Sequence, residues 1–221
     1  MLRKALGFAS IAALGTMFPF VLFWAPIEAN MGIVQKIMYI HVPSIITTYI
    51  ALTLSFFCSI AYLWKRTDYL DILAYSCMEI GAVFCGLALA TGSIWGKPTW
   101  NTYWTWDARL TLTLILFLIF VGYLLLRKFT DPGEQQARLC AIIAIIGALD
   151  IPLIHLSVVW WRTLHQASTL MSPKPAIDTP LLVMLLISLG AFGLFFAFLL
   201  ATRVNLEQKR RAYMRQLAEM F

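Results

Sequence analysis

Residues 95–111 carry an unusual density of flat aromatic side chains: Trp95, Trp100, Tyr103, Trp104 and Trp106. Trp and Tyr rings gather at membrane interfaces, and that tendency accounts for about two or three of them. It accounts less well for the whole run, which is closed by Asp107 and Arg109. Because aromatic faces form broad apolar platforms, this spacing favours a surface that holds a large, flat ligand such as a porphyrin.

Charged side chains flank the aromatic run and suit a ligand with carboxylates. Lys97, Arg109 and Arg162 are candidates to receive the propionates of a porphyrin, Arg with paired donors. Asp107 is expected either to pair with Arg109 or to orient a neighbouring side chain. These residues, with the tryptophans, form the predicted ligand site.

The chain has only three histidines, His41, His155 and His165. A single histidine is most often a hydrogen-bonded structural group. A haem iron, however, takes imidazoles from both faces of the ring, and such ligands can be far apart in sequence. We therefore expect His41 and His165 to be axial ligands, with the tryptophan-rich loop between them. His155 lies deeper in a predicted span and is expected to support or pack.

Other common sites of chemistry are missing from the sequence. None of the four cysteines forms Cys-x-x-Cys, which argues against a c-type cytochrome or a dithiol redox enzyme. They are expected to be small apolar packing residues. The segment Gly92–Lys97 is too short for a phosphate-binding loop, so any ATP would be handled by another subunit.

Two acids, Glu79 and Asp150, fall inside predicted membrane spans. Acids in such positions are costly and are functional candidates. They could relay protons or pair with each other. Alternatively, each is a protonated, hydrogen-bonded structural group, with Asp150 satisfying backbone that Pro152 leaves free.

The composition places these residues in a membrane protein. The 221 residues are 61% hydrophobic and only 13% charged. Apolar stretches of about 20 residues predict transmembrane helices, because lipid leaves no other partner for the backbone. We predict six, over residues 5–25, 43–64, 72–94, 110–127, 139–158 and 180–202. The expected fold is an all-α, polytopic membrane protein, a bundle of six transmembrane helices in one domain covering residues 1–221.

The distribution of basic residues predicts the topology. Of 17 Lys and Arg, 12 fall on one side of the predicted spans and 5 on the other, namely Lys36, Lys97, Arg109, Arg162 and Lys174. The basic side faces the cytoplasm. Both termini are therefore expected to be cytoplasmic, with the tryptophan-rich loop (about 95–109) and the loop of about 159–179 facing outward. Gly96 and Pro98 are expected to fix the start of the first loop, and Pro43 to place His41 at the start of the second helix.

The first span and the basic C-terminal segment are both interpreted as structural features. The first span follows Arg3 and Lys4 but is longer than a signal-peptide core and lacks a clear cleavage site, so we expect a retained helix. The basic C-terminal segment abuts a span and is expected to anchor it or to touch acidic lipid, not nucleic acid.

The combined motifs resemble a known family. The segments Trp95-Gly96-x-x-Trp100 and Trp104-x-Trp106-Asp107-x-Arg109-Leu110-Thr111 resemble the "WWD" signature of haem-handling membrane proteins in cytochrome c biogenesis. Together with six spans, His41-Val-Pro43 and Trp160-Trp161-x-x-Leu164-His165-Gln166, they resemble the heme exporter protein C family over nearly the whole chain.

The resemblance implies a function and a set of partners. Its members bind haem b at the outer, periplasmic face of the bacterial inner membrane, with axial histidines that correspond to His41 and His165. They pass haem to a membrane-anchored haem chaperone, which holds it covalently. They work with ABC-type transporter subunits and a very small membrane subunit, and the ATPase releases the loaded chaperone.

The sequence therefore predicts a haem-delivery protein that is not itself an enzyme. One alternative is a haem lyase that attaches haem to apocytochrome c, although larger members with a further histidine pair fit that role better. A second is a transporter of haem or a small solute that uses Glu79 and Asp150 as a path.

Overall fold

The computed structural model describes residues 1–29, 31–161, 163–165 and 177–220. Six helical segments are long and apolar enough to cross a membrane, which confirms the predicted polytopic all-α fold. No β-strand occurs among the described residues. The elements are α1 (Leu2–Pro19), a π-helical turn (Phe20–Trp24), a 3₁₀ turn (Ile33–Ile37), α2 (Met38–Lys65), α3 (Asp68–Trp100), α4 (Ala108–Phe129), α5 (Glu134–Ala148), α6 (Asp150–Trp160) and α7 (Thr179–Ala218).

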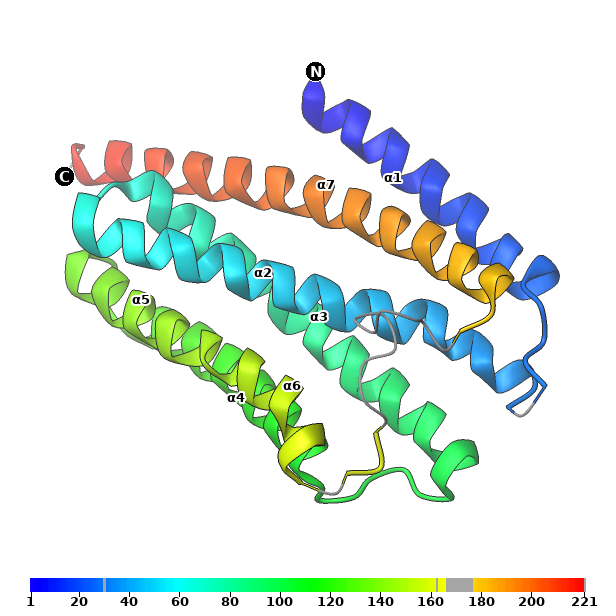
Figure 1. Cartoon of the computed structure of the whole chain (residues 1–221). Coiled ribbons are helices and arrows are strands. Elements are labelled where there is room, and N and C mark those ends of the chain that lie inside the picture. Colours follow the sequence, from blue (N-terminus) through cyan, green and yellow to red (C-terminus); the bar gives the residue numbers. More distant parts are fainter. Residues whose placement is uncertain (30, 162, 166–176, 221) are drawn as a thin grey trace.

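The helices form three layers (Figure 1). The pair α2 and α3, which share the most extensive contact in the molecule, lies in the middle. Helices α1 and α7 cover one side of this pair, and α4, α5 and α6 cover the other. The connection 101–107 lies at one end of the bundle, and the end of α7 lies at the opposite end.

Small side chains allow α2 and α3 to pack closely. Ser44, Thr48, Ser55 and Ser59 on α2 are all fully buried, at helical spacing. The Ser55 hydroxyl donates a hydrogen bond to the carbonyl of Ala74 on α3 at 3.2 Å. Small and hydroxylated residues at a helix interface let the backbones approach and supply hydrogen bonds that lipid cannot. This approach brings the start of α2 close to the end of α3, where the candidate site lies.

Several helix boundaries differ from those predicted, among them the end of α7, which lies at Ala218 and not at 202. Helix α2 starts at Met38, not 43, so Pro43 lies inside it and His41 in its first turn. Helix α3 runs to Trp100, not 94, so the prediction that Gly96 and Pro98 begin a loop is wrong. The last turn of α3 is held by Lys97, whose ammonium donates to the carbonyl of Asn101 at 3.1 Å. Asn101 ends the helix in the left-handed conformation that asparagine tolerates.

The fifth span is divided into α5 and α6 at Leu149. Pro152 explains the break, because it lacks an N–H and its ring excludes the carbonyl of residue 148. Asp150 begins α6 and is 6% exposed, and its Oδ2 has no hydrogen-bond partner among the described residues. The expected bond from Asp150 to the freed backbone is not formed by that oxygen.

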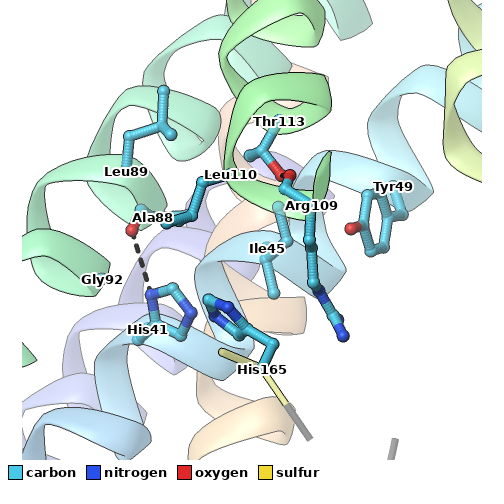
Figure 2. A pocket seen from close by; sticks show the side chains of 10 residues that line it. All are labelled: His41, Ile45, Tyr49, Ala88, Leu89, Gly92, Arg109, Leu110, Thr113 and His165. Atoms are coloured by element: carbon cyan, nitrogen blue, oxygen red, sulfur yellow. Dashed lines mark hydrogen bonds between the residues drawn. The ribbon is translucent and has the colours of Figure 1, made fainter. Parts of the chain in front are cut away.

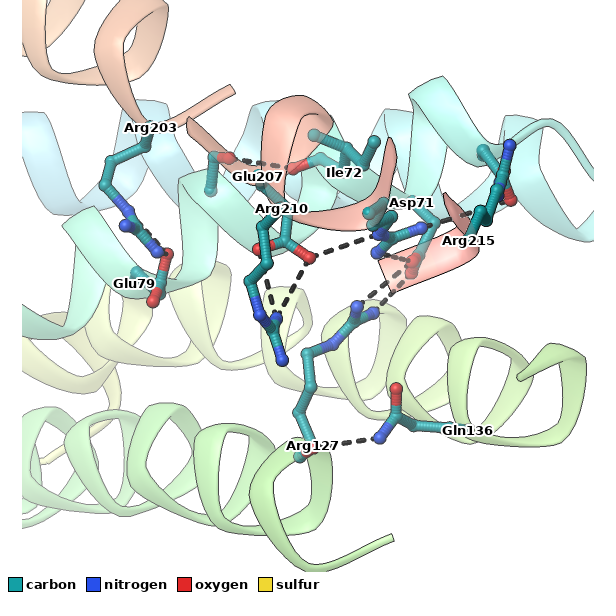
Figure 3. Close-up of polar contacts among 12 residues, drawn as sticks. Asp71, Ile72, Glu79, Arg127, Gln136, Arg203, Glu207, Arg210 and Arg215 are labelled. Carbon is teal, nitrogen blue, oxygen red and sulfur yellow. Dashed lines mark hydrogen bonds and ion pairs between the residues drawn. The ribbon is translucent and has the colours of Figure 1, made fainter. Parts of the chain in front are cut away.

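An ionic cluster connects α7 to α3 and α4 (Figure 3). It lies at the end of the bundle opposite to the candidate site. The Asp71 carboxylate is 5% exposed and accepts hydrogen bonds from both terminal nitrogens of Arg127 and from Arg211 at 2.6 Å. Glu207, also buried, accepts from Arg211 at 3.1 Å. Glu79 accepts from Nε of Arg203 at 2.9 Å, so this acid pairs with an arginine of α7 instead of with Asp150.

Replacing Asp71 by Asn should destabilise the protein, because Arg127 would remain charged and buried without a carboxylate. Removing one partner of a buried pair costs about 3–5 kcal/mol. The midpoint of thermal unfolding in detergent, followed by helical circular dichroism, should fall clearly below that of the wild type.

The control for this variant is Glu134→Gln. It breaks the ion pair between Glu134 and Arg66, whose charged groups are 3.2 Å apart and whose side chains are 67% and 35% exposed. The change should cost less than about 1 kcal/mol. Equal midpoints for the two variants would contradict the importance of the buried cluster.

Candidate ligand site between His41 and His165

Side chains from three helices and from the segment 163–165 surround a cavity of about 60 Å³ at the end of the bundle that carries the tryptophans (Figure 2). Because His41, Ile45 and Tyr49 follow one another at four-residue spacing, they share one face of α2. The lining residues are His41, Ile45 and Tyr49 of α2, Ala88, Leu89 and Gly92 of α3, Arg109, Leu110 and Thr113 of α4, and His165.

His41 is oriented by α3. Its Nδ1 lies 3.0 Å from the carbonyl oxygen of Ala88 and 3.2 Å from the Thr91 hydroxyl. A carbonyl only accepts, so Nδ1 carries the proton, and in the neutral ring Nε2 keeps a free lone pair. A hydrogen bond at one ring nitrogen that fixes the other as the donor atom is the usual arrangement of a metal-ligating histidine.

Gly92 leaves the room that the His41 ring occupies. A Cβ at this position would lie 2.9 Å from Cε1 of His41 and 3.3 Å from its Nδ1. Any larger residue would therefore displace the imidazole. This contact shows how closely α2 and α3 approach each other at the site.

His165 faces the same cavity from the connection that follows α6 (Figure 2). Its ring meets Trp100 edge-on, with centroids 4.7 Å apart, and its buried Nδ1 has no partner among the described residues. Burial lowers the pKa of His165 to about 4, and the positive charge of Arg109 adds to this while Asp107 opposes it. The imidazole is thus neutral at physiological pH, the form that can bind a metal.

Asp107 connects the start of α4 to the segment 163–165, a role that sequence reasoning left open. Its Oδ1 accepts from the backbone N–H of Leu110 at 2.9 Å and caps α4. Its Oδ2 accepts from the N–H of Leu164 at 3.3 Å. No ion pair with Arg109 is formed, so Asp107 orients its neighbours, and it holds the residue that precedes His165.

The tryptophans divide into two groups. Trp95 and Trp100 lie on the last turns of α3, and the rings contact His41 and His165 respectively, with the Trp95 and His41 centroids 5.8 Å apart. Trp104 lies in the following connection and packs edge-on against Trp106, which is 76% exposed. The expected platform is therefore built partly from a helix and partly from a loop.

Of the two predicted propionate partners that the structure describes, Arg109 lines the cavity and Lys97 does not. Lys97 instead bonds to Asn101 and lies over the ring of Tyr103, 5.6 Å from its centroid. Arg162 lies outside the described residues. Among the lining residues that sequence reasoning missed, Tyr49 had a signal, since it lies two helical turns after His41 on the same face.

His155 does not line the cavity, as expected of a supporting residue. Its Nδ1 lies 3.0 Å from the carbonyl oxygen of Ile151, one turn earlier on α6. Its ring contacts Tyr49 with centroids 5.1 Å apart.

These features define a class: a polytopic helical membrane protein with two imidazoles that converge among tryptophan rings at one end of the bundle. Such an arrangement can bind a metal at the centre of a flat ligand.

Comparison with known proteins identifies the family. The family model described as heme exporter protein C matches residues 1–219. A Heme exporter protein C from Bradyrhizobium diazoefficiens is 40% identical over 188 residues, covering 85% of this chain and 72% of the relative. One from Escherichia coli strain K12 is 37% identical over 222 residues, covering 96% and 87%. A "putative cytochrome c biosynthesis ccmC-like mitochondrial protein" from Marchantia polymorpha is 36% identical over 179 residues, covering 78% and 75%. The chain belongs to the heme exporter protein C family.

Substitutions at Asp107 should separate its two hydrogen bonds. Asp107→Ala removes the cap of α4 and should destabilise the protein by about 1 kcal/mol. Asp107→Asn keeps a capping oxygen, so its thermal midpoint should stay close to that of the wild type. Its amide nitrogen cannot accept from the N–H of Leu164.

Hydrogen exchange of the Leu164 amide should therefore become faster in both variants. Protection of this amide in Asp107→Asn equal to that in the wild type would contradict the proposed connection between the two segments.

Proposed function

We propose that this protein binds haem b at the outer, periplasmic face of the bacterial inner membrane and delivers it to a membrane-anchored haem chaperone for cytochrome c maturation. The observation that carries the proposal is the convergence of His41 and His165 on one cavity, each against a tryptophan ring. Family membership supports haem as the ligand.

In this proposal haem is the cargo, and the protein holds it through ligands to the iron and through contacts with the macrocycle. The free Nε2 of His41 and an imidazole nitrogen of His165 bind the iron from opposite faces. A cavity of about 60 Å³ admits one edge of the macrocycle, and the remainder lies against the tryptophan rings at its mouth. Trp95, Trp100, Trp104 and Trp106 provide this apolar support, and Arg109 receives a propionate.

The topology supports an outward-facing site. An even number of spans places both termini on one side, and most basic residues lie at that end, which the positive-inside rule assigns to the cytoplasm. The histidine cavity lies near the opposite end, where a periplasmic chaperone can reach the haem.

The partners follow from the same proposal. The covalent bond to haem forms at a histidine of the chaperone, so this chain acts by positioning its cargo and is not an enzyme. ABC-type transporter subunits and a very small membrane subunit complete the complex, and the ATPase releases the loaded chaperone.

The two alternatives have less support. The transport path would use Glu79 and Asp150, but Glu79 pairs with Arg203 and neither acid lines the cavity. A haem lyase would need a second pair of histidines. This chain has only His155 besides the two proposed ligands, so it lacks such a pair.

Absorption spectra of the purified protein test haem binding. With haem added, the wild type should show sharp six-coordinate bands, as prepared and after dithionite. His41→Ala and His165→Ala should each lose one ligand, broaden the bands and weaken haem binding by roughly ten-fold or more.

Imidazole in solution provides the control for misfolding. It should restore the six-coordinate bands of His165→Gly, since it replaces only the missing ligand. Unchanged bands in the double variant His41→Ala/His165→Ala would refute haem ligation by these residues.

Transfer of haem to the chaperone tests delivery. Haem-loaded protein mixed with the apo-chaperone in detergent should yield covalent haem on the chaperone. Trp106→Ala should slow this transfer roughly 2- to 10-fold. The reason is that the exposed indole of Trp106 supports the edge of the haem that the chaperone approaches.

Trp64→Ala is the matched control, since Trp64 is 84% exposed near the end of α2 farther from the site. It should transfer haem at the wild-type rate. Covalent haem formed equally fast from free haem, without this protein, would contradict the delivery role.

A further inference from the structure

The cavity holds more hydrogen-bond donors than two iron ligands require. The Tyr49 hydroxyl and the Arg109 guanidinium both belong to its lining, and neither has a hydrogen bond or ion pair with a described residue (Figure 2). The Thr113 hydroxyl, in contrast, is satisfied, because it donates to the carbonyl of Arg109 at 2.8 Å. None of the lining residues that the structure describes carries a carboxylate. A ligand in the cavity can therefore supply the acceptor that Tyr49 and Arg109 lack.

Tyr49 lies deep enough to meet the far edge of a ring held by His41. The two residues are two turns apart on one face of α2, about 12 Å at 1.5 Å per residue. Tyr49 packs against the apolar cluster formed by residues of α2, α3, α4, α5 and α6. A phenol in such surroundings normally finds a hydrogen-bond partner, because a buried polar group without one is costly.

The ring of Tyr49 is held in place from behind by His155. The two ring centroids are 5.1 Å apart, and the imidazole is fixed by the hydrogen bond of its Nδ1 to the Ile151 carbonyl. Asp150, which lies on α6 like His155, interacts with Tyr49 electrostatically, but no hydrogen bond joins Asp150 and Tyr49 in the described part of the chain. The hydroxyl thus keeps its position beside the cavity without an acceptor of its own.

We propose that Tyr49 and Arg109 form a carboxylate subsite that takes a propionate of the bound haem, with His155 as a positioning residue for Tyr49. This inference rests on the proposed function and adds the orientation of the cargo. The propionates share one edge of the ring, so anchoring that edge at the cavity floor turns the vinyl-bearing part toward the mouth. The edge that reacts with the chaperone is then presented outward.

The test compares haem with its dimethyl ester, in which the carboxylates cannot accept a charge-assisted bond. Both are titrated into the full-length protein in detergent. Tyr49→Phe should weaken binding of haem by about ten-fold and leave binding of the ester unchanged, because only the hydroxyl is removed. The six-coordinate bands should persist in this variant, since the iron ligands are intact.

Tyr39→Phe is the matched control. Tyr39 lies on the same helix, is fully buried and also has an unpartnered hydroxyl, but it does not line the cavity. It should bind both compounds as the wild type does. His155→Ala should lower the preference for haem over the ester, and His155→Phe, which keeps an aromatic ring against Tyr49, should restore it.

The outcomes separate this inference from the proposed function. If Tyr49→Phe weakens the binding of haem and of the ester equally, or leaves both unchanged, the proposed carboxylate subsite is wrong, while the proposal of haem binding stands. If the wild type binds neither compound, the proposed function fails and the subsite with it.

Discussion

The close approach of α2 and α3 is the contact on which the site depends. In lipid, helices gain little from hiding apolar surface, so packing and interhelical hydrogen bonds must hold them together. Ser44, Thr48, Ser55 and Ser59 keep the interface narrow, and Ser55 bonds across it. At the outer end the same approach places His41 against the carbonyl of Ala88 and requires glycine at position 92. The orientation of the histidine is thus a consequence of helix packing.

Polar groups are arranged differently at the two ends of the bundle. At the α7 end, the buried carboxylate of Asp71 meets the guanidinium groups of Arg127 and Arg211, so charge is neutralised within the chain. At the histidine end, donors predominate and several have no internal acceptor. Because unpaired buried polar groups are costly, the second arrangement is typical of a ligand site and the first of a structural joint.

Asp107 shows how a binding segment is positioned without a regular element. One of its carboxylate oxygens caps α4, and the other holds the backbone of Leu164. The capped helix is rigid, and its start therefore fixes the residue before His165. A single side chain connects two outer segments that lie more than 50 residues apart, as the sequence separation of 57 shows.

Sequence patterns predicted much of this protein because they reflect local constraints. Apolar runs of membrane-spanning length indicate six helices. Residue type, together with position near the predicted outer ends of the spans, indicates His41 and His165 as candidate ligands. The errors fell at helix ends. Gly96 and Pro98 were expected to fix the start of the loop, yet α3 continues to Trp100, where Lys97 and the left-handed Asn101 complete its last turn.

The sequence by itself determined the number of spans and the kinds of side chain at the outer end, since hydrophobicity and residue type are properties of each segment alone. Only the tertiary structure decided that His41 and His165 share one cavity, that Tyr49 also lines it, and that Asp107 connects Leu164 to α4. It also decided that Glu79 is paired with Arg203. The reason is physical: these contacts join residues far apart in the chain, and their geometry is set by how closely the helices pack.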